Sequence, residues 1–230
     1  MKKYTHILFD LDQTLWDFEA NCTETLHELF DNYQLNNIIN NKESFITTYK
    51  QVNKELWFKY SRKEISKDTI RNYRFNYTFT RLGIPEEQIP EKINADFLAI
   101  CPTKTNLVPY AKDLLNYLYP KYHLHIVTNG FKESQSIKIF HSRLSDYFKE
   151  IVDSEMSGFL KPDKRIFEYT LTKINAGCQD CIMIGDDLEA DVLGARNAGI
   201  DAIYFNPSRH KDYTSVPSEI KCLSELFKIL

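Results

Sequence analysis

Two carboxylates and a hydroxyl follow an apolar segment close to the N-terminus. Residues 7–15 read ILFDLDQTL, so Asp10, Asp12 and Thr14 come at the end of a short strand-like run. Acidic residues at the end of an apolar strand reduce the hydrophobic surface that the strand can bury, so we expect these carboxylates to have a function. Open α/β sheets bind ligands at this end of their strands. These residue types favour the binding of a divalent cation and attack on a phosphate.

Three more polar segments each follow a strand-like run further along the chain. They contain Thr128, Asn129 and Gly130; Lys161 before Pro162; and Gly185, Asp186, Asp187 and Asp191. Each has an ordinary structural interpretation when taken alone: a common turn, an exposed lysine and, for Asp187, a helix cap. Together they supply what phosphate chemistry needs, because hydroxyl, amide and ammonium donors hold an anion and carboxylates hold a cation.

The elements that must position these groups alternate between strands and helices. Short β-branched or aromatic runs predict strands over residues 4–9, 124–127, 150–152, 181–184 and 202–205. Helical stretches lie between them at residues 132–140, 164–173 and 189–197. This alternation predicts an α/β protein with a Rossmann-like parallel sheet. Because the carboxyl ends of parallel strands share one edge, we expect all four polar segments at that edge.

The interval 16–97 interrupts this alternation. Residues 73–79 alternate with period two, as a strand does, but a cap at Ser66 or Asp68 and a stop at Gly83 favour a helix. The interval therefore reads as a helical insertion directly after the acidic strand. The expected organisation is a Rossmann-like core domain, residues 1–15 and 98–230, with an inserted helical cap domain, residues 16–97.

The composition argues against several classes of partner. The chain has 230 residues, 29 basic against 32 acidic side chains and a formal net charge of -3, which favours neither a nucleic-acid polymer nor a membrane surface. The apolar stretch before Asp10 is too short for a signal peptide, and no run reaches the roughly 18 apolar residues of a membrane span. Five cysteines are an odd number and predict reduced thiols. We expect a cytoplasmic protein with a small-molecule substrate, and the sequence leaves the oligomeric state open.

Taken in order, the four polar segments resemble the motifs of the haloacid dehalogenase-like superfamily of hydrolases. The superfamily pattern is D-x-D-x-T, a strand-end Ser or Thr, a Lys before Pro, and G-D-D or G-D-x-x-x-D, and this chain fills every position. The insertion resembles the helical C1-type cap of the superfamily. Residues 12–18, 128–130 and 154–158 are most similar to the bacterial pyrimidine 5′-nucleotidase branch. The namesake dehalogenases lack the second carboxylate that Asp12 supplies here.

The resemblance implies a role for each polar residue. Asp10 is the expected nucleophile, which forms an aspartyl-phosphate, and Asp12 is the expected acid and then base. Mg²⁺ is the expected cofactor, held by the carboxylates of Asp10 and Asp186 and by the backbone carbonyl of Asp12. Lys161 is expected to be catalytic and to bind substrate by offsetting charge between Asp10 and Asp186. The remaining expected residues are Thr128 and Asn129 for the phosphoryl oxygens, and Thr14, Asp187 and Asp191 in supporting positions.

These roles predict a Mg²⁺-dependent phosphomonoester hydrolase that acts on nucleoside 5′-monophosphates, pyrimidine ones first. A sugar-phosphate or phosphoglycolate phosphatase, a phosphomutase of the β-phosphoglucomutase kind, and a non-catalytic metal- or phosphate-binding module are the alternatives. Substrate choice is expected to come from the cap. Trp16, Asp17 and Phe18 either line the entrance or pack the cap onto the core. The basic residues of the insertion, Arg74 among them, are interpreted as solvated helix faces.

Overall fold

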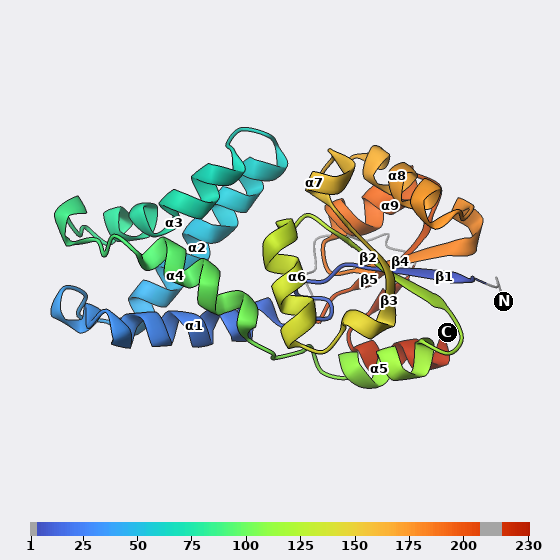
Figure 1. The fold of residues 1–230 in the computed structure, drawn as a ribbon, viewed down its shortest axis with the longest axis horizontal. Helices are drawn as coiled ribbons and strands as arrows, with labels where there is room; N and C mark the ends of the chain where they lie inside the picture. Colours follow the sequence, from blue (N-terminus) through green and yellow to red (C-terminus); the bar gives the residue numbers. More distant parts are fainter. Residues whose placement is uncertain (1–3, 208–217) are drawn as a thin grey trace. The chain divides into compact units, whose positions relative to one another are not determined.

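The structure, a computed structural model, describes residues 4–207 and 218–230. These residues form two compact units (Figure 1). One unit holds the chain up to Phe18 and from Thr105 onward, and the other is the segment Glu19–Lys104. The segment begins and ends several residues after the interval 16–97 that the sequence indicates.

The larger unit is built on a six-stranded parallel sheet. Its strands lie in the order β3-β2-β1-β4-β5-β6, and every neighbouring pair is parallel. They are β1 (His6–Phe9), β2 (His123–Thr128), β3 (Phe148–Asp153), β4 (Cys181–Gly185), β5 (Asp201–Phe205) and β6 (Glu219–Ile220). The predicted α/β class with a Rossmann-like parallel sheet is confirmed. Only β6 has no counterpart among the predicted strands, because two residues show no periodicity.

Helices cover both faces of this sheet. They are α5 (Ala111–Leu118), α6 (Lys132–His141), α7 (Ser154–Ser157), α8 (Lys164–Ile174) and α9 (Gly194–Asn197), with the π-helical segment η6 (Leu188–Leu193) and the short helices η4 (Ser145–Tyr147), η5 (Cys178–Asp180) and η7 (Leu223–Lys228). Figure 1 shows α8 and α9 on one side of the sheet and α5 on the other. On the first side, Leu8 and Met183 belong to the same buried cluster as Phe167 of α8. On the other, the rings of Tyr117 and Phe227 lie 5.0 Å apart.

The chain changes direction across the sheet at β1. The strands β2 and β3 lie to one side of β1, and β4, β5 and β6 lie to the other. The register pairs Phe9 with Ile184, so the residues that follow β1 and β4 emerge side by side. In open α/β sheets a ligand binds at such a switch point, outside the carboxyl ends of the strands. Asp10 and Asp186 are the residues placed there.

The helix predicted over residues 189–197 has an irregular start. A π-helical segment covers Leu188–Leu193, and α9 continues from Gly194 to Asn197. The Asp187 side chain caps the segment by accepting hydrogen bonds from the amides of Glu189 and Ala190. Single π-helical turns are frequent at functional sites, and apolar spacing alone cannot reveal one additional residue in a turn.

The second unit is helical. It contains α1 (Phe18–Asn32), α2 (Lys42–Ser61), α3 (Lys67–Arg81), α4 (Ile93–Ile100) and the short helices η1 (Leu35–Asn37), η2 (Glu86–Gln88) and η3 (Cys101–Thr103). Residues 73–79 lie within α3, and the Ser66 side chain caps that helix by accepting from the Thr69 amide. The helical interpretation of this stretch is therefore confirmed. Within residues 4–207 and 218–230, no helix is long and apolar enough to cross a membrane.

Aromatic side chains fill the interior of the helical unit. The ring of Tyr49 lies 4.8 Å from Phe75 and 5.2 Å from Phe97. Arg74 is buried among them, with its guanidinium 5.1 Å from the Phe97 centroid and 2.8 Å from the Tyr49 hydroxyl, to which it donates. The interpretation of Arg74 as part of a solvated face is therefore wrong. Its positive charge is compatible with burial because the aromatic faces attract the cation and the Tyr49 hydroxyl accepts a hydrogen bond from it.

Candidate active site

The carboxyl ends of β1 and β4 bring three acidic side chains together. Asp10 follows β1 and Asp186 follows β4, and the Asp10 amide donates to the Ile184 carbonyl at 3.0 Å. Asp191 reaches the same place from η6. One carboxylate oxygen from each of these three aspartates lies within 4.8 Å of the other two. A single cation could bridge oxygens at this spacing.

Lys161 is in contact with two of these acids. Its Nζ donates to Asp10 Oδ1 at 2.7 Å, to Asp191 Oδ1 at 2.6 Å and to the Val127 carbonyl at 2.7 Å. Its side chain is only 3% exposed. Burial alone would lower the pKa of Lys161, but the carboxylates of Asp10 and Asp191 outweigh that effect and raise it. Lys161 is therefore a fixed positive charge between two acids.

Burial raises the pKa of each of the three acids in this cluster. It raises the pKa of Asp10 to about 7, against the opposing effect of Lys161. It raises the pKa of Asp186 to about 9, and the negative charges of Asp10 and Asp191 contribute to that shift. Burial also raises the pKa of Asp191. A bound divalent cation opposes such shifts because it stabilises ionised carboxylates.

Thr128 and Asn129 begin the loop after β2 but make different contacts. The Thr128 hydroxyl oxygen accepts from the Gly130 amide at 3.0 Å and from Gln135 Nε2 at 2.7 Å. The Asn129 amide instead binds the backbone of Lys161, accepting from its N at 2.8 Å and donating to its O at 2.9 Å. The Lys161-Pro162 peptide that follows is cis. In this structure Asn129 holds the loop that presents Lys161.

The three residues expected in supporting positions have distinct environments. Thr14 is buried and donates to Asp186 Oδ1 at 3.1 Å. Asp191 Oδ2 accepts from the Asp187 amide at 3.1 Å, whereas the exposed carboxylate of Asp187 caps η6. Gly185 permits the approach of Asp191, because a Cβ atom at residue 185 would lie 2.2 Å from Asp191 Oδ2. The structure thus brings Thr14 and Asp191 into the cluster and places the Asp187 side chain at its edge.

Two side chains that sequence reasoning missed hold Asp12. Gln135 Nε2 donates to Asp12 Oδ2 at 2.9 Å, and Lys138 Nζ lies 2.6 Å and 2.8 Å from the two carboxylate oxygens. Gln135 and Lys138 are both buried on α6, next to Ile139. Spacing of three and four residues puts them on one inward stripe of the helix. A polar pair on such a stripe requires partners, and this is the signal that could have identified it.

Trp16 and Phe18 lie beside Lys138. Lys138 Nζ is 4.6 Å from the Trp16 ring centroid and 5.9 Å from that of Phe18. Trp16 is fully buried, and its backbone forms isolated β-bridges with Asp12 and Leu107. The Trp16 ring is therefore not an exposed surface on which a substrate stacks, and of the two alternatives for this residue its burial favours packing.

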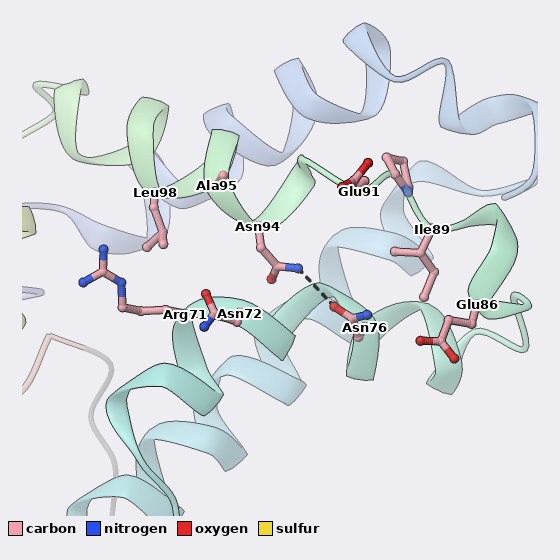
Figure 2. Close-up of a pocket in the computed structure, with 10 residues that line it drawn as sticks. Arg71, Asn72, Asn76, Glu86, Ile89, Glu91, Asn94, Ala95 and Leu98 are labelled. Atoms are coloured by element: carbon pink, nitrogen blue, oxygen red, sulfur yellow. Dashed lines mark hydrogen bonds between the residues drawn. The ribbon is translucent and has the colours of Figure 1, made fainter.

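The helical unit has a hollow of its own between α3, η2 and α4, with a volume of about 610 Å³ (Figure 2). Asn94 donates to Asn76 Oδ1 at 3.1 Å and accepts from the Phe75 amide at 3.1 Å, so its amide is already engaged. Arg71 and Glu86 contribute charge to the wall. No residue of the four sequence motifs lines this hollow.

The chain belongs to the haloacid dehalogenase-like hydrolases, since the family model of that description matches residues 4–199. It is therefore a hydrolase, and the family predicted from the motifs is confirmed. The chain is 31% identical to the putative HAD-hydrolase YfnB of Bacillus subtilis, over 100% of this chain and 97% of YfnB. A crystal structure of YfnB bound to magnesium is similar with a TM-score of 0.88 and covers 100% of this chain and 99% of its own.

Two further relatives have named activities. The pyrimidine 5′-nucleotidase YjjG of Escherichia coli is 32% identical over 91% of this chain and 89% of its own length. The glyceraldehyde 3-phosphate phosphatase of Pyrococcus abyssi is 29% identical over 97% of this chain and 92% of its own length. The similar proteins thus include both nucleotide and sugar-phosphate phosphatases.

Proposed function

We propose that this protein is a Mg²⁺-dependent phosphomonoester hydrolase that acts through an aspartyl-phosphate on Asp10, with pyrimidine nucleoside 5′-monophosphates as substrates. The observation that carries the proposal is the buried contact of Lys161 with both Asp10 and Asp191, beside Asp186. Phosphoryl transfer requires a nucleophile, fixed positive charge and a cation at one point. The cluster contains the first two and the oxygen donors for the third.

The donor set fits Mg²⁺, which prefers carboxylate and carbonyl oxygens. Asp10 and Asp186 would hold the ion through carboxylates and Asp12 through its backbone carbonyl. The carboxylate of Asp191 accepts hydrogen bonds from Lys161 and a backbone amide, so it would orient the site. When bound, Mg²⁺ neutralises charge on the oxygens of the transferring phosphoryl group.

The chain's own residues account for both steps of hydrolysis. In the first, an Asp10 oxygen bonds to phosphorus, the ester P–O bond breaks, and the leaving oxygen takes the proton of Asp12. In the second, water attacks phosphorus while Asp12 removes its proton, and the bond to Asp10 breaks to release inorganic phosphate. The Thr128 hydroxyl and the Lys161 ammonium would hold the phosphoryl oxygens throughout.

The similarity to YjjG supports a nucleotide as substrate. We further propose that the helical unit, Glu19–Lys104, is a C1-type cap that selects this substrate, and that the enzyme acts on small molecules in the cytoplasm. The similarity to the Pyrococcus abyssi enzyme favours a second candidate, a phosphatase for short sugar phosphates.

A phosphate-release assay tests the proposal. The purified protein is given pyrimidine and purine nucleoside 5′-monophosphates, glyceraldehyde 3-phosphate, phosphoglycolate and β-glucose 1-phosphate, each with Mg²⁺ and with chelator. We expect the highest kcat/KM with the pyrimidine nucleotides and no turnover with chelator. Asp10→Asn should abolish release, whereas Asp113→Asn, on the exposed surface of α5, should not.

Other outcomes assign other functions. A preference for glyceraldehyde 3-phosphate selects the second candidate, and dependence on a bisphosphate activator selects the phosphomutase. No release from any monoester by folded, Mg²⁺-loaded protein would leave only a binding role.

A further inference from the structure

Gln135 and Lys138 lie one helical turn apart on α6 and make contact with the same carboxylate. The Asp12 side chain is 28% exposed, whereas the Lys138 side chain is 8% exposed. Asp12 thus reaches toward solvent, and both of its oxygens are held from the protein side. The Gln135 amide also donates to Thr128. Gln135 therefore links Asp12, the proposed acid, to Thr128, the proposed phosphate ligand.

The position of Lys138 distinguishes it from a phosphate ligand. Its ammonium is engaged by the two Asp12 oxygens and faces the Trp16 ring at 4.6 Å. The buried lysine among Asp10, Asp186 and Asp191 is a different residue, Lys161. An ammonium enclosed by a carboxylate and an aromatic face is directed at that carboxylate.

Asp12 is held at its backbone by a bridge to Trp16, whereas its carboxylate is held by the side chains of α6. It lies in the turn after β1, next to Gln13, whose φ of 62° is in the left-handed region. Proton transfer requires the donor within about 2.6–3.2 Å of the accepting oxygen, and a rotation of the carboxyl group would lose that geometry. Two anchors on a regular helix restrict the rotation.

We propose that Lys138 and Gln135 are positioning residues that aim Asp12 at the leaving oxygen of the ester. The inference rests on the proposed function, in which Asp12 protonates that oxygen and later takes a proton from water. The ion pair with Lys138 also stabilises the carboxylate left on Asp12 after the first transfer. Neither residue is assigned a contact with the substrate.

The leaving group provides the test. A nucleoside 5′-monophosphate expels an alkoxide and needs the proton, whereas an aryl ester such as p-nitrophenyl phosphate expels a stable phenolate. Because kcat/KM reports only steps up to formation of the aspartyl-phosphate, it isolates the acid role of Asp12. We expect Lys138→Met to lower kcat/KM on the order of 10- to 100-fold with the nucleotide, a part of the usual general-acid contribution. With the aryl ester the loss should stay below about threefold.

The second step gives an independent readout. If Lys138→Met leaves Asp12 poorly aimed as a base, dephosphorylation becomes slow, and rapid mixing with the aryl ester should show a burst of p-nitrophenolate. Lys138→Arg should restore much of the nucleotide activity, because arginine can also bond both carboxylate oxygens. In an Asp12→Asn background, adding Lys138→Met should change the residual rate by less than about twofold, since coupled residues are not additive.

Lys132→Met is the matched control, since Lys132 is exposed at the start of the same helix. Equal losses of kcat/KM with both esters would overturn the inference, because they would show a role in phosphate binding or in the fold. Unchanged nucleotide turnover would overturn it too. Either result leaves the proposed function standing as long as the wild-type protein hydrolyses the nucleotide, and that function fails only if the wild type releases no phosphate.

Discussion

Lys161 Nζ and Asp191 Oδ1 lie 2.6 Å apart, with only 3% and 1% of the two side chains exposed. The pair joins the loop after β3 to the helical segment after β4, and Lys161 continues the contact to Asp10. A buried charge is tolerated only with partners of opposite sign. The proposed nucleophile is thus held in a network whose charges depend on one another.

Replacement of Lys161 should disrupt both stability and activity. Lys161→Met leaves Asp10 and Asp191 without their cation, and breaking a buried pair costs about 3–5 kcal/mol. Phosphate release should fall by on the order of 100-fold or more, as for loss of a fixed charge at the reacting centre. Urea unfolding and the phosphate assay measure the two effects. Lys164→Met is the control, because the Lys164 side chain is 61% exposed, and it should change stability by less than about 0.5 kcal/mol. Comparable losses in both variants would contradict the prediction.

Gly185 is predicted to be required for the position of Asp191. In Gly185→Ala the new Cβ atom would lie 2.2 Å from Asp191 Oδ2 and 2.6 Å from Asp191 Cβ, so the side chain must move. We expect a loss of about 1–3 kcal/mol in unfolding free energy and a marked fall in kcat.

Gly158→Ala is the comparison for this variant. Gly158 has a φ of 77° with no atom within 4 Å of an added Cβ, so its substitution carries only backbone strain. It should cost about 1 kcal/mol and leave kcat near the wild-type value. Full activity in Gly185→Ala would show that Asp191 can be displaced without consequence.

Magnesium should stabilise the protein through the acidic cluster. A ligand at 100 times its dissociation constant adds about 2.7 kcal/mol to the unfolding free energy. Thermal unfolding should therefore shift upward with Mg²⁺ and return with chelator. Asp186→Asn should lose this shift, while Asp113→Asn on α5 should keep it. An identical Mg²⁺ response in Asp186→Asn would place the ion elsewhere.

His125 is predicted to make stability fall in mild acid. Burial, followed by the charges of His6 and His123, lowers the pKa of His125 to about 4. The unfolded chain takes up this proton near pH 6.5, so between about pH 6.5 and 4 the unfolded state binds more protons and stability decreases as the pH falls. The effect should approach about 3 kcal/mol at pH 4 and below, since one pKa unit corresponds to about 1.4 kcal/mol.

Urea unfolding at several pH values, with Mg²⁺ present, measures this dependence. His125→Gln should flatten the slope in that window relative to the wild type, whereas His141→Gln, at the exposed end of α6, should retain it. A wild-type slope that persists in His125→Gln would assign the acid sensitivity to other groups.

Much of this fold can be predicted from local patterns. Residues 4–9 and 181–184 are apolar runs bounded by polar residues, and they form β1 and β4 because such runs are buried in a helix-covered sheet. Residues 73–79 show the limit of periodicity, since their alternation fits a strand. The cap at Ser66 and the stop at Gly83 favour a helix instead, and the structure has α3 there. Its aromatic residues are compatible with a helix because a helix can be buried over a wide face.

By itself, the sequence determined the class of protein and the strand ends at which its motif residues lie, because Asp10, Asp186 and the lysine before Pro162 belong to short motifs. Only the tertiary structure decided their partners. Lys138 lies 126 residues from Asp12 in the chain, yet its Nζ is 2.6 Å from that carboxylate. The pKa of Asp186 is raised to about 9 because distant segments bury its carboxyl group and place Asp10 and Asp191 beside it. Hydrogen bonding and desolvation depend on which distant segments exclude water together, and no local pattern contains that information.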